Sequence, residues 1–168
     1  MNVKILGCGH QVPEKIIKND YFKNTVNKDD EWIYKKTGIR KRHIITSNQE
    51  YKEIVVKACR DAIKNSNVET SEIELVILAT STPSSMFGGV STIISELGIK
   101  NAISFDITLA CNGFNSAFIT AYQYIKNNSA KKCLIIGADC LSRWVDWNDY
   151  KTSILFGDGC GAMILEGK

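Results

Sequence analysis

The chain has 168 residues, of which 44% are hydrophobic and 23% are charged, and its formal net charge at pH 7 is +3. These values are typical of a globular protein that buries a sizeable core, and we expect one domain over residues 1–168. The small charge, with no basic stripe interleaved with aromatic residues, argues against nucleic-acid binding. The apolar runs LVILA and CLIIGA are too short to span a bilayer, and the N-terminus lacks the apolar core of a signal peptide. We therefore expect a cytoplasmic protein with no membrane partner.

Regularly spaced apolar residues predict alternating strands and helices along the chain. A strand over residues 3–6 ends at GCG and is followed by an irregular polar segment to about residue 46, in which a short helix begins at Asp29 or Asp30. The later elements are a helix over 50–66, a strand over 74–79, a helix over 90–97, a strand over 103–107, a helix over 112–127 and a strand over 132–138. The C-terminal run TSILFGDGCGAMILEG reads as two strands joined through residues 157–159. This alternation predicts an α/β fold with a mostly parallel mixed sheet covered by helices on both faces.

The six cysteines predict neither a disulfide framework nor a zinc site. The chain is large and apolar enough to fold without disulfides, and it contains no C-x-x-C pair. Its two histidines, His10 and His43, are too few for the usual zinc ligand sets, so we expect no metal. Free thiols inside apolar elements behave as small hydrophobes, and five cysteines are interpreted as packing residues: Cys8, Cys59, Cys133, Cys140 and Cys160.

Cys111 differs from the other cysteines because it lies where a predicted strand gives way to a predicted helix. The unpaired N–H groups and positive dipole end of a helix favour a thiolate at such a junction. The small neighbours Ala110 and Gly113 leave room for a substrate carbonyl, and ligands usually bind at the strand ends of such sheets. Position alone leaves two interpretations open, a packing residue or a nucleophile.

The segment DITLACNGF, residues 106–114, resembles the active-site segment of the ketoacyl-acyl-carrier-protein synthase III family. Four further segments are similar to family signatures in the same order, at residues 7–20, 29–44, 86–101 and 146–165. The resemblance implies the N-terminal half of the thiolase fold, whose complete form is a five-layered αβαβα sandwich. It also implies decarboxylative Claisen condensation of an acyl-CoA with malonyl-acyl carrier protein, the step that starts fatty acid synthesis, in a homodimer.

The resemblance also assigns the groups that would meet the acyl chain. Cys111 would be the nucleophile that accepts the acyl group as a thioester, and its backbone N–H would contribute to an oxyanion hole. Phe87 matches the aromatic residue that lines the acyl pocket, commonly from the partner subunit; as an isolated loop aromatic it could instead be a core residue.

Coenzyme A binding is implied by four other positions. Trp32 matches the tryptophan that packs against the adenine, with a core aromatic as the alternative interpretation. Lys36 and Tyr150 stand where the family usually has arginines, and Lys151 could supply the charge that Tyr150 lacks. The coenzyme A thioester would be a substrate, with no cofactor bound permanently.

Two other features have a general and a specific interpretation. The basic residues Lys35, Lys36, Arg40, Lys41 and Arg42 suit either an ordinary solvated face or the phosphates of coenzyme A and an acidic carrier protein. Asp158 is expected to be structural and to shape the GDG turn through hydrogen bonds to the backbone.

The resemblance places the family's catalytic histidine and asparagine in a second half, and no histidine follows His43 in this sequence. We therefore expect half of a longer enzyme that is inactive in condensation by itself, with an exposed apolar face. Two alternatives remain: a related acyltransferase that uses the same cysteine on a small molecule, and a non-catalytic half-domain that acts by pairing with another chain.

Overall fold

The computed structural model describes residues 2–86 and 88–168. Its main sheet has the strand order β1-β7-β6-β4-β5, with β1 (Val3–Gln11), β4 (Leu75–Ala79), β5 (Ile103–Ile107), β6 (Lys132–Cys140) and β7 (Asp158–Gly167). Strand β4 pairs in parallel with β5 and β6, whereas β7 runs antiparallel to β1 and β6. All these strands except β7 therefore run in the same direction, which confirms the predicted mostly parallel mixed sheet.

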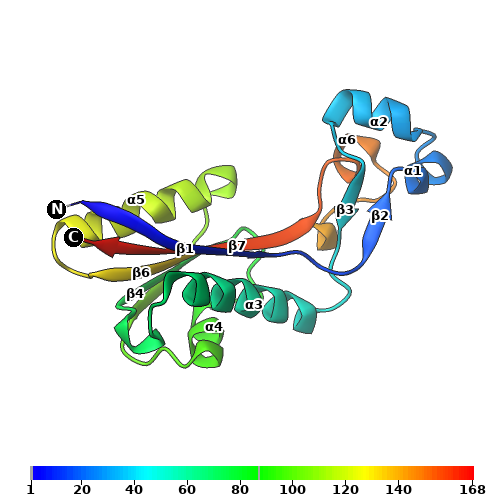
Figure 1. Cartoon of the computed structure of the whole chain (residues 1–168). Coiled ribbons are helices and arrows are strands. Elements are labelled where there is room, and N and C mark those ends of the chain that lie inside the picture. Colours follow the sequence, from blue (N-terminus) through cyan, green and yellow to red (C-terminus); the bar gives the residue numbers. More distant parts are fainter. Residues whose placement is uncertain (1, 87) are drawn as a thin grey trace.

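Helices cover both faces of this sheet, as predicted. Helices α3 (Asn48–Ser66) and α4 (Val90–Leu97) pack on one face, and α5 (Gly113–Lys126) packs on the other (Figure 1). Strand β4 is buried along its whole length between the two helix layers, as its continuous apolar run LVILA requires. Helix α3 starts slightly earlier than expected because Ser47 caps it, with the Ser47 side chain accepting the Glu50 N–H.

Strand β1 is longer than predicted because α3 lies directly against it. A Cβ at residue 7 would be 2.5 Å from the Ser66 nitrogen, and a Cβ at residue 9 would be 2.2 Å from the Ala58 oxygen. Glycine at both positions lets the helix backbone approach the strand, so the GCG sequence continues β1 instead of ending it. The register of β1 against β7 shifts between Ile5 and Gly7, which marks a β-bulge.

The segment predicted to be irregular folds into a small module at the far end of β1 and β7 (Figure 1). This small module contains the antiparallel pair β2 (Ile16–Lys18) and β3 (Lys41–His43) together with α1 (Asp20–Thr25) and α2 (Asp30–Thr37). The helix predicted to begin at Asp29 or Asp30 is confirmed, and Asp29 caps it. Helix α6 (Tyr150–Ser153) joins the module, whose own core contains Phe22, Ile33 and Ile154.

The C-terminal run predicted as two strands instead forms one strand, β7, preceded by α6. Asp158 explains the difference, because its buried carboxylate holds the start of β7 against two other segments. It accepts hydrogen bonds from the Ile45 N–H at 2.7 Å and the Ser142 N–H at 2.9 Å, and also from the Ser142 hydroxyl. Asp158 is structural, as expected, but it joins distant segments and does not shape a hairpin.

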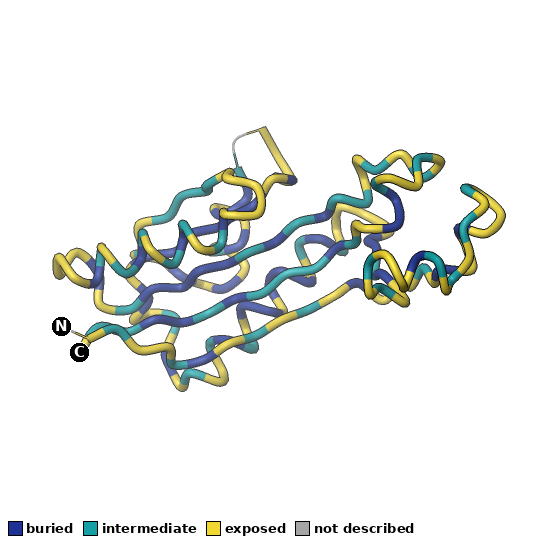
Figure 2. The backbone as a smooth tube through the Cα atoms, turned by 90° about the horizontal axis from the view of Figure 1, so that it is seen from above, coloured by how far each residue is buried: buried dark blue, intermediate teal, exposed yellow. Residues whose placement is uncertain are grey.

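Short 3-10 turns complete the secondary structure at residues Thr70–Glu72, Ala110–Asn112 and Leu141–Arg143. Figure 2 shows buried residues along the strands and exposed residues along the outer sides of the helices and the loops. The two ends of the chain are adjacent, since the Asn2 N–H donates to the Lys168 oxygen at 2.7 Å. In the part of the chain that the structure describes, we find no helix with the length and apolar character needed to cross a membrane.

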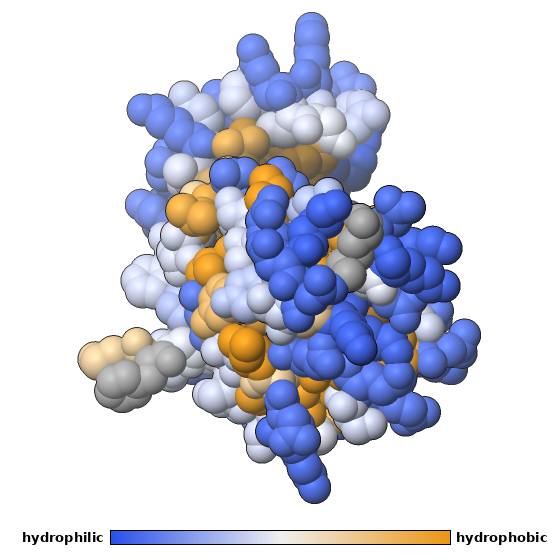
Figure 3. Space-filling model, turned by 90° about the vertical axis from the view of Figure 1, so that its left-hand side faces the viewer, coloured by the Kyte–Doolittle hydropathy of each residue, from blue (hydrophilic) through white to orange (hydrophobic). Residues whose placement is uncertain are grey.

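Several large apolar side chains are exposed on α5 and on the two edge strands of the sheet. Ile119 on α5 is 59% exposed, Ile5 on β1 is 54% exposed and Ile103 on β5 is 50% exposed. Figure 3 shows apolar side chains gathered in a band next to a hydrophilic area on one end of the molecule. An apolar band of this kind marks a surface suited to association.

Candidate active site

Cys111 lies in the 3-10 turn that joins β5 to α5. Its side chain is a free thiol and its residue is exposed. The turn leads directly into the 14 residues of α5, so the first N–H groups of that helix lie immediately after the cysteine in the chain. The predicted junction of strand and helix is therefore confirmed.

The backbone next to Cys111 is held in an unusual conformation. Ala110 has φ of +45°, in the left-handed region that residues with a Cβ adopt rarely. Two hydrogen bonds fix the strand end that precedes it: the Thr80 N–H donates to the Ile107 oxygen at 3.0 Å, and the Thr108 hydroxyl donates to the Thr80 oxygen at 2.9 Å. Backbone strain that surrounding contacts maintain is often found where a side chain has to be presented for a function.

A cavity of about 340 Å³ opens beside Cys111 at the ends of β4 and β6 and the start of β7. Small residues form most of its wall, namely Ala79, Ala110, Gly113, Gly137, Ala138, Gly159 and Gly161. Gly137 is required for packing, because a Cβ there would lie 2.9 Å from the Phe114 ring. The small wall residues thus leave an open space beside Cys111.

The other five cysteines are mostly unsuited to nucleophilic chemistry. Burial raises the pKa of Cys133 and that of Cys160 to about 12, and it also raises the pKa values of Cys59 and Cys140. These four thiols stay protonated near neutral pH, which agrees with their interpretation as packing residues. Cys8 was wrongly placed among the packing residues, since it is exposed on β1.

We expect limiting iodoacetamide at pH 8 to alkylate Cys111 faster than any other cysteine. The four thiols with raised pKa values lack thiolate character, and three of them are also buried, so the competition is between Cys111 and the exposed Cys8. Peptide mass mapping measures the order of labelling, and circular dichroism checks that the protein stays folded. Labelling of Cys8 ahead of Cys111 would contradict this prediction.

Two aromatic residues and a lysine form a second cluster, on the small module. Trp32 on α2 and Tyr150 on α6 meet edge to face, with ring centroids 5.9 Å apart. The Lys28 Nζ lies 4.7 Å from the Trp32 ring centroid and 5.1 Å from that of Tyr150, so one ammonium group contacts both rings. Trp32 is half-buried and packs against the core of the small module, whereas Tyr150 is exposed. The sequence analysis did not identify Lys28, because nothing in the loop that carries it predicts its contacts with the two rings.

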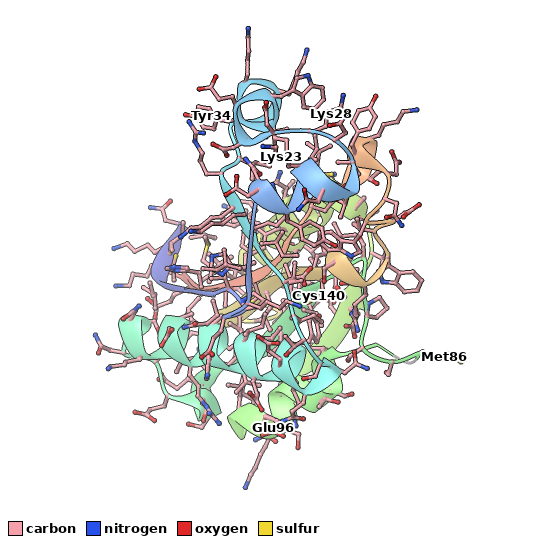
Figure 4. All side chains as sticks on the ribbon, turned by 90° about the vertical axis from the view of Figure 1, so that its right-hand side faces the viewer. Lys23, Lys28, Tyr34, Met86, Glu96 and Cys140 are labelled. Carbon is pink, nitrogen blue, oxygen red and sulfur yellow. The ribbon has the colours of Figure 1, made fainter. Side chains whose placement is uncertain are left out.

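The other predicted coenzyme A residues, Lys36 and Lys151, lie on the same two helices as this aromatic pair. Lys36 lies one helical turn after Trp32 on α2, and Lys151 follows Tyr150 on α6; both are exposed. Figure 4 shows Lys28 on one side of α2 and Tyr34 on the other. Since the small module lies on the side of the molecule toward which the N-terminal end of α5 points, the aromatic pair and Cys111 lie toward the same end of the sheet (Figure 1).

The basic cluster predicted from residues 35–42 is smaller on the surface than its sequence indicates. Arg42 is only 4% exposed and therefore belongs to the interior. Arg40 pairs with Asp30, and its guanidinium carbon lies 3.6 Å from the Tyr34 ring centroid. The exposed cations of this cluster are therefore Lys35, Lys36, Arg40 and Lys41, of which Arg40 is paired with Asp30.

Phe87, the predicted acyl-pocket residue, lies outside the described residues. The loop around it is fixed at both ends by carboxylates from the sheet. Asp139 accepts the Ser81 N–H at 2.7 Å, and Asp106 accepts the Gly89 N–H at 2.9 Å. Between these anchors Met86 is 91% exposed and projects away from the body of the protein (Figure 4).

The titratable residues do not assemble a metal site in the described parts of the chain, where no group of three or more His, Cys, Asp or Glu side chains could hold an ion. Neither histidine is among the residues that line the cavity beside Cys111. His10 lies on β1, and the His43 Nδ1 is hydrogen-bonded to the Pro13 oxygen at 2.6 Å.

Comparison with known proteins shows which proteins this chain is similar to. The family model described as 3-oxoacyl-[acyl-carrier-protein (ACP)] synthase III matches residues 105–168, which include Cys111, α5 and β7. The beta-ketoacyl-[acyl-carrier-protein] synthase III of Prochlorococcus marinus (strain NATL2A) is 46% identical over 166 residues, which cover 99% of this chain and 49% of that protein. The chain is similar to beta-ketoacyl-[acyl-carrier-protein] synthase III proteins over about half of their length.

Solved structures show the same relationship in three dimensions. The 3-oxoacyl-[acyl-carrier-protein] synthase III of Aquifex aeolicus VF5 superposes with a TM-score of 0.95 at 36% identity, over 99% of this chain and 54% of that one. The priming beta-ketosynthase of the R1128 polyketide pathway superposes with a TM-score of 0.94 at 30% identity, over 99% of this chain and 50% of that one. The chain thus spans about half the length of its synthase III relatives and corresponds to their N-terminal half, with half of the thiolase fold.

Proposed function

We propose that this chain supplies the acyl-accepting half of a beta-ketoacyl-[acyl-carrier-protein] synthase III, which condenses an acyl-CoA with malonyl-acyl carrier protein. The observation that carries the proposal is Cys111, an exposed thiol at the start of α5 beside a cavity walled by small residues. A thiolate there can accept an acyl group, and the small side chains of the alanines and glycines in the cavity wall leave space for an acyl thioester to approach it.

In the first step, the Cys111 thiolate attacks the carbonyl carbon of the acyl-CoA thioester. A new carbon–sulfur bond forms to Cys111 as the bond to the coenzyme A sulfur breaks, and coenzyme A leaves as a thiolate that takes up a proton. Negative charge develops on the carbonyl oxygen during this step, and N–H groups at the start of α5 can stabilise it.

In the second step, the malonyl group on acyl carrier protein loses carbon dioxide, and the electron pair released becomes a carbanion at its α-carbon. That carbon attacks the Cys111 thioester, the bond to sulfur breaks, and the ketoacyl product leaves on the carrier protein. Cys111 returns to its starting form, so the reaction needs no permanently bound cofactor.

The coenzyme A nucleotide would bind at the small module. Trp32 and Tyr150 offer aromatic surface for the adenine, and Lys28 provides a cation already in contact with both rings. Exposed Lys36 and Lys151 suit the phosphates, and the exposed Lys35 and Lys41 suit an acidic carrier protein. Phe87 would line the acyl pocket of a partner subunit in a homodimer, in the cytoplasm.

The test is condensation of acetyl-CoA with malonyl-acyl carrier protein by the full-length protein. We expect a ketoacyl product, one equivalent of free coenzyme A and one of carbon dioxide for each turnover. Release of coenzyme A without a ketoacyl product, in the presence of a small-molecule acceptor, would instead support the related acyltransferase. Absence of any acylation at Cys111 would support the non-catalytic half-domain.

A second candidate follows from the priming beta-ketosynthase, which shares the fold at 30% identity. This chain could likewise start a polyketide from an acyl-CoA, with the same chemistry at Cys111. Comparing acyl carrier proteins from fatty acid and polyketide pathways as malonyl donors separates the two assignments, and we expect the fatty acid carrier to be preferred.

We expect Trp32→Ala in the full-length protein to weaken acyl-CoA binding by about fivefold, because it removes an aromatic contact of about 1 kcal/mol. It should destabilise the fold less than loss of a fully buried aromatic residue, since Trp32 is half-buried against the core of the small module. Isothermal calorimetry with coenzyme A measures the affinity, and Trp144→Ala, at a residue that is 76% exposed, is the matched control. A variant that binds normally but melts much earlier would show that Trp32 is a core residue.

A further inference from the structure

Arg42 is a buried cation that contacts two segments distant from each other in the sequence, residues 17–22 and residue 154. It extends from β3, and its Nη2 donates to the Asn19 Oδ1 at 2.7 Å and to the Ile154 oxygen at 3.1 Å. Its Nη1 donates to the Ile17 oxygen at 3.3 Å, and its guanidinium carbon lies 4.7 Å from the Phe22 ring centroid. Burying a charge against neutral oxygens is costly, which indicates that Arg42 has a positional role.

Asn19 extends these contacts to α2. This residue is 1% exposed, and its amide nitrogen donates to the Asp30 Oδ1 at 2.8 Å and to the Ile39 oxygen at 2.6 Å. Its amide oxygen accepts from Arg42, so the amide uses both of its ends. Asp30 is the first residue of α2 and lies two positions before Trp32.

The other end of the connection is the helix that carries Tyr150. Ile154, whose oxygen accepts from Arg42, is the C-cap residue of α6. A continuous path of hydrogen bonds therefore runs from α6 through Arg42 and Asn19 to Asp30 on α2. The two helices that it connects are those that carry Tyr150 and Trp32.

We propose that Arg42 and Asn19 are positioning residues that set the spacing of Trp32 and Tyr150, and thereby the affinity for the nucleotide of the acyl donor. This inference rests on the proposed function in one respect, that the aromatic pair binds coenzyme A. The forked guanidinium is needed because it donates to oxygens on separate segments at fixed angles, which the single ammonium of lysine does not reproduce. Neither residue touches the reacting thioester.

The test uses the full-length protein and two donors with the same reacting group. Acetyl-CoA carries the nucleotide, and the acetyl thioester of N-acetylcysteamine lacks it. Two variants interrupt the path of hydrogen bonds in different ways. Arg42→Lys replaces the forked guanidinium by a single ammonium group. The isosteric Asn19→Asp keeps the oxygen that accepts from Arg42 but replaces the amide that donates to Asp30 by a second carboxylate. The matched controls are Arg60→Lys and Asn65→Asp, at exposed residues of α3.

We expect both path variants to raise KM for acetyl-CoA about tenfold, the scale of one charge-assisted hydrogen bond. Their kcat values, and KM for the short thioester, should change less than about twofold, because these residues do not act at the reacting centre. The controls should behave as the wild type. Equal losses with both donors would assign the residues a purely structural role and overturn the inference, as would unchanged values with acetyl-CoA.

Calorimetric titration with coenzyme A separates this inference from the proposed function. A wild-type protein that binds coenzyme A but forms no ketoacyl product would overturn the proposed reaction, and the affinities of the variants would still decide the positioning role. Circular dichroism checks folding. If Arg42→Lys does not fold, the isosteric Asn19→Asp variant decides the outcome.

Discussion

Replacing Cys111 by alanine is expected to abolish covalent acylation of the full-length protein and to lower the condensation rate by about a thousandfold or more. The reason is that alanine offers no atom to form the thioester, and the cavity wall supplies no other exposed nucleophile. Cys160 also lines the cavity, but burial raises its pKa to about 12 and its sulfur donates to the Ile54 oxygen on the opposite helix layer. Intact-mass spectrometry after incubation with acetyl-CoA measures the loss of the acetyl adduct.

The matched control for this prediction is Cys8→Ala, because Cys8 is the other exposed cysteine of the six, all of which the structure describes. It lies on β1 and does not line the cavity beside Cys111. The Cys8 variant should keep the full adduct and the full rate. An adduct that survives in Cys111→Ala and disappears in Cys8→Ala would overturn the assignment of the nucleophile.

The elements that carry Cys111 could be predicted from the sequence because local patterns determine them. Strand β5 begins and ends where expected, and α4 stops at Gly98, which adopts the left-handed conformation that commonly ends a helix. The turn at Cys111 could be predicted because the strand pattern of β5 ends there and the helical pattern of α5 begins. The left-handed conformation of Ala110 could not be predicted, since alanine has no local preference for it.

Apart from α2, the elements of the small module were not predicted, because they are short and are stabilised by contacts that are distant in the sequence. Strands β2 and β3 have three residues each, too few to show a period. Their partners include Ile154, which lies 112 positions from Arg42. The burial of Arg42 depends on its contact with Ile154, and charge patterning alone therefore suggested that Arg42 is on the surface. The contact between Lys28 and Tyr150 likewise joins residues that are distant in the sequence.

The length of β1 and the single strand at the C-terminus were wrong for a related reason. Gly7 and Gly9 usually end a strand, but here they allow α3 to lie against the strand backbone. The GDG sequence suggested a hairpin, whereas Asp158 uses its carboxylate on Ile45 and Ser142. In both cases a tertiary contact prevails over the local preference of glycine.

The final prediction concerns residues 1–168 produced alone, and it follows from what lines the cavity. Condensation builds negative charge on a thioester oxygen, which requires positioned hydrogen-bond donors in a site closed to water. The described cavity wall contains glycine, alanine, one phenylalanine, one aspartate and two cysteines, and thus offers no imidazole or amide side chain. The family resemblance places the histidine and asparagine of this reaction in the second half.

We therefore expect residues 1–168 alone to form no ketoacyl product from acetyl-CoA and malonyl-acyl carrier protein, while still accepting an acetyl group slowly at Cys111. Slow acylation needs only a thiolate and a fitting cavity, whereas decarboxylation depends on the absent donors. Adding the second half of a synthase III relative should restore condensation, since exposed apolar residues such as Ile119 offer a surface for association. Cys111→Ala in the first half should cancel that restored activity. Efficient product formation by residues 1–168 alone would show instead that the donors come from groups within this chain or from a second copy of it.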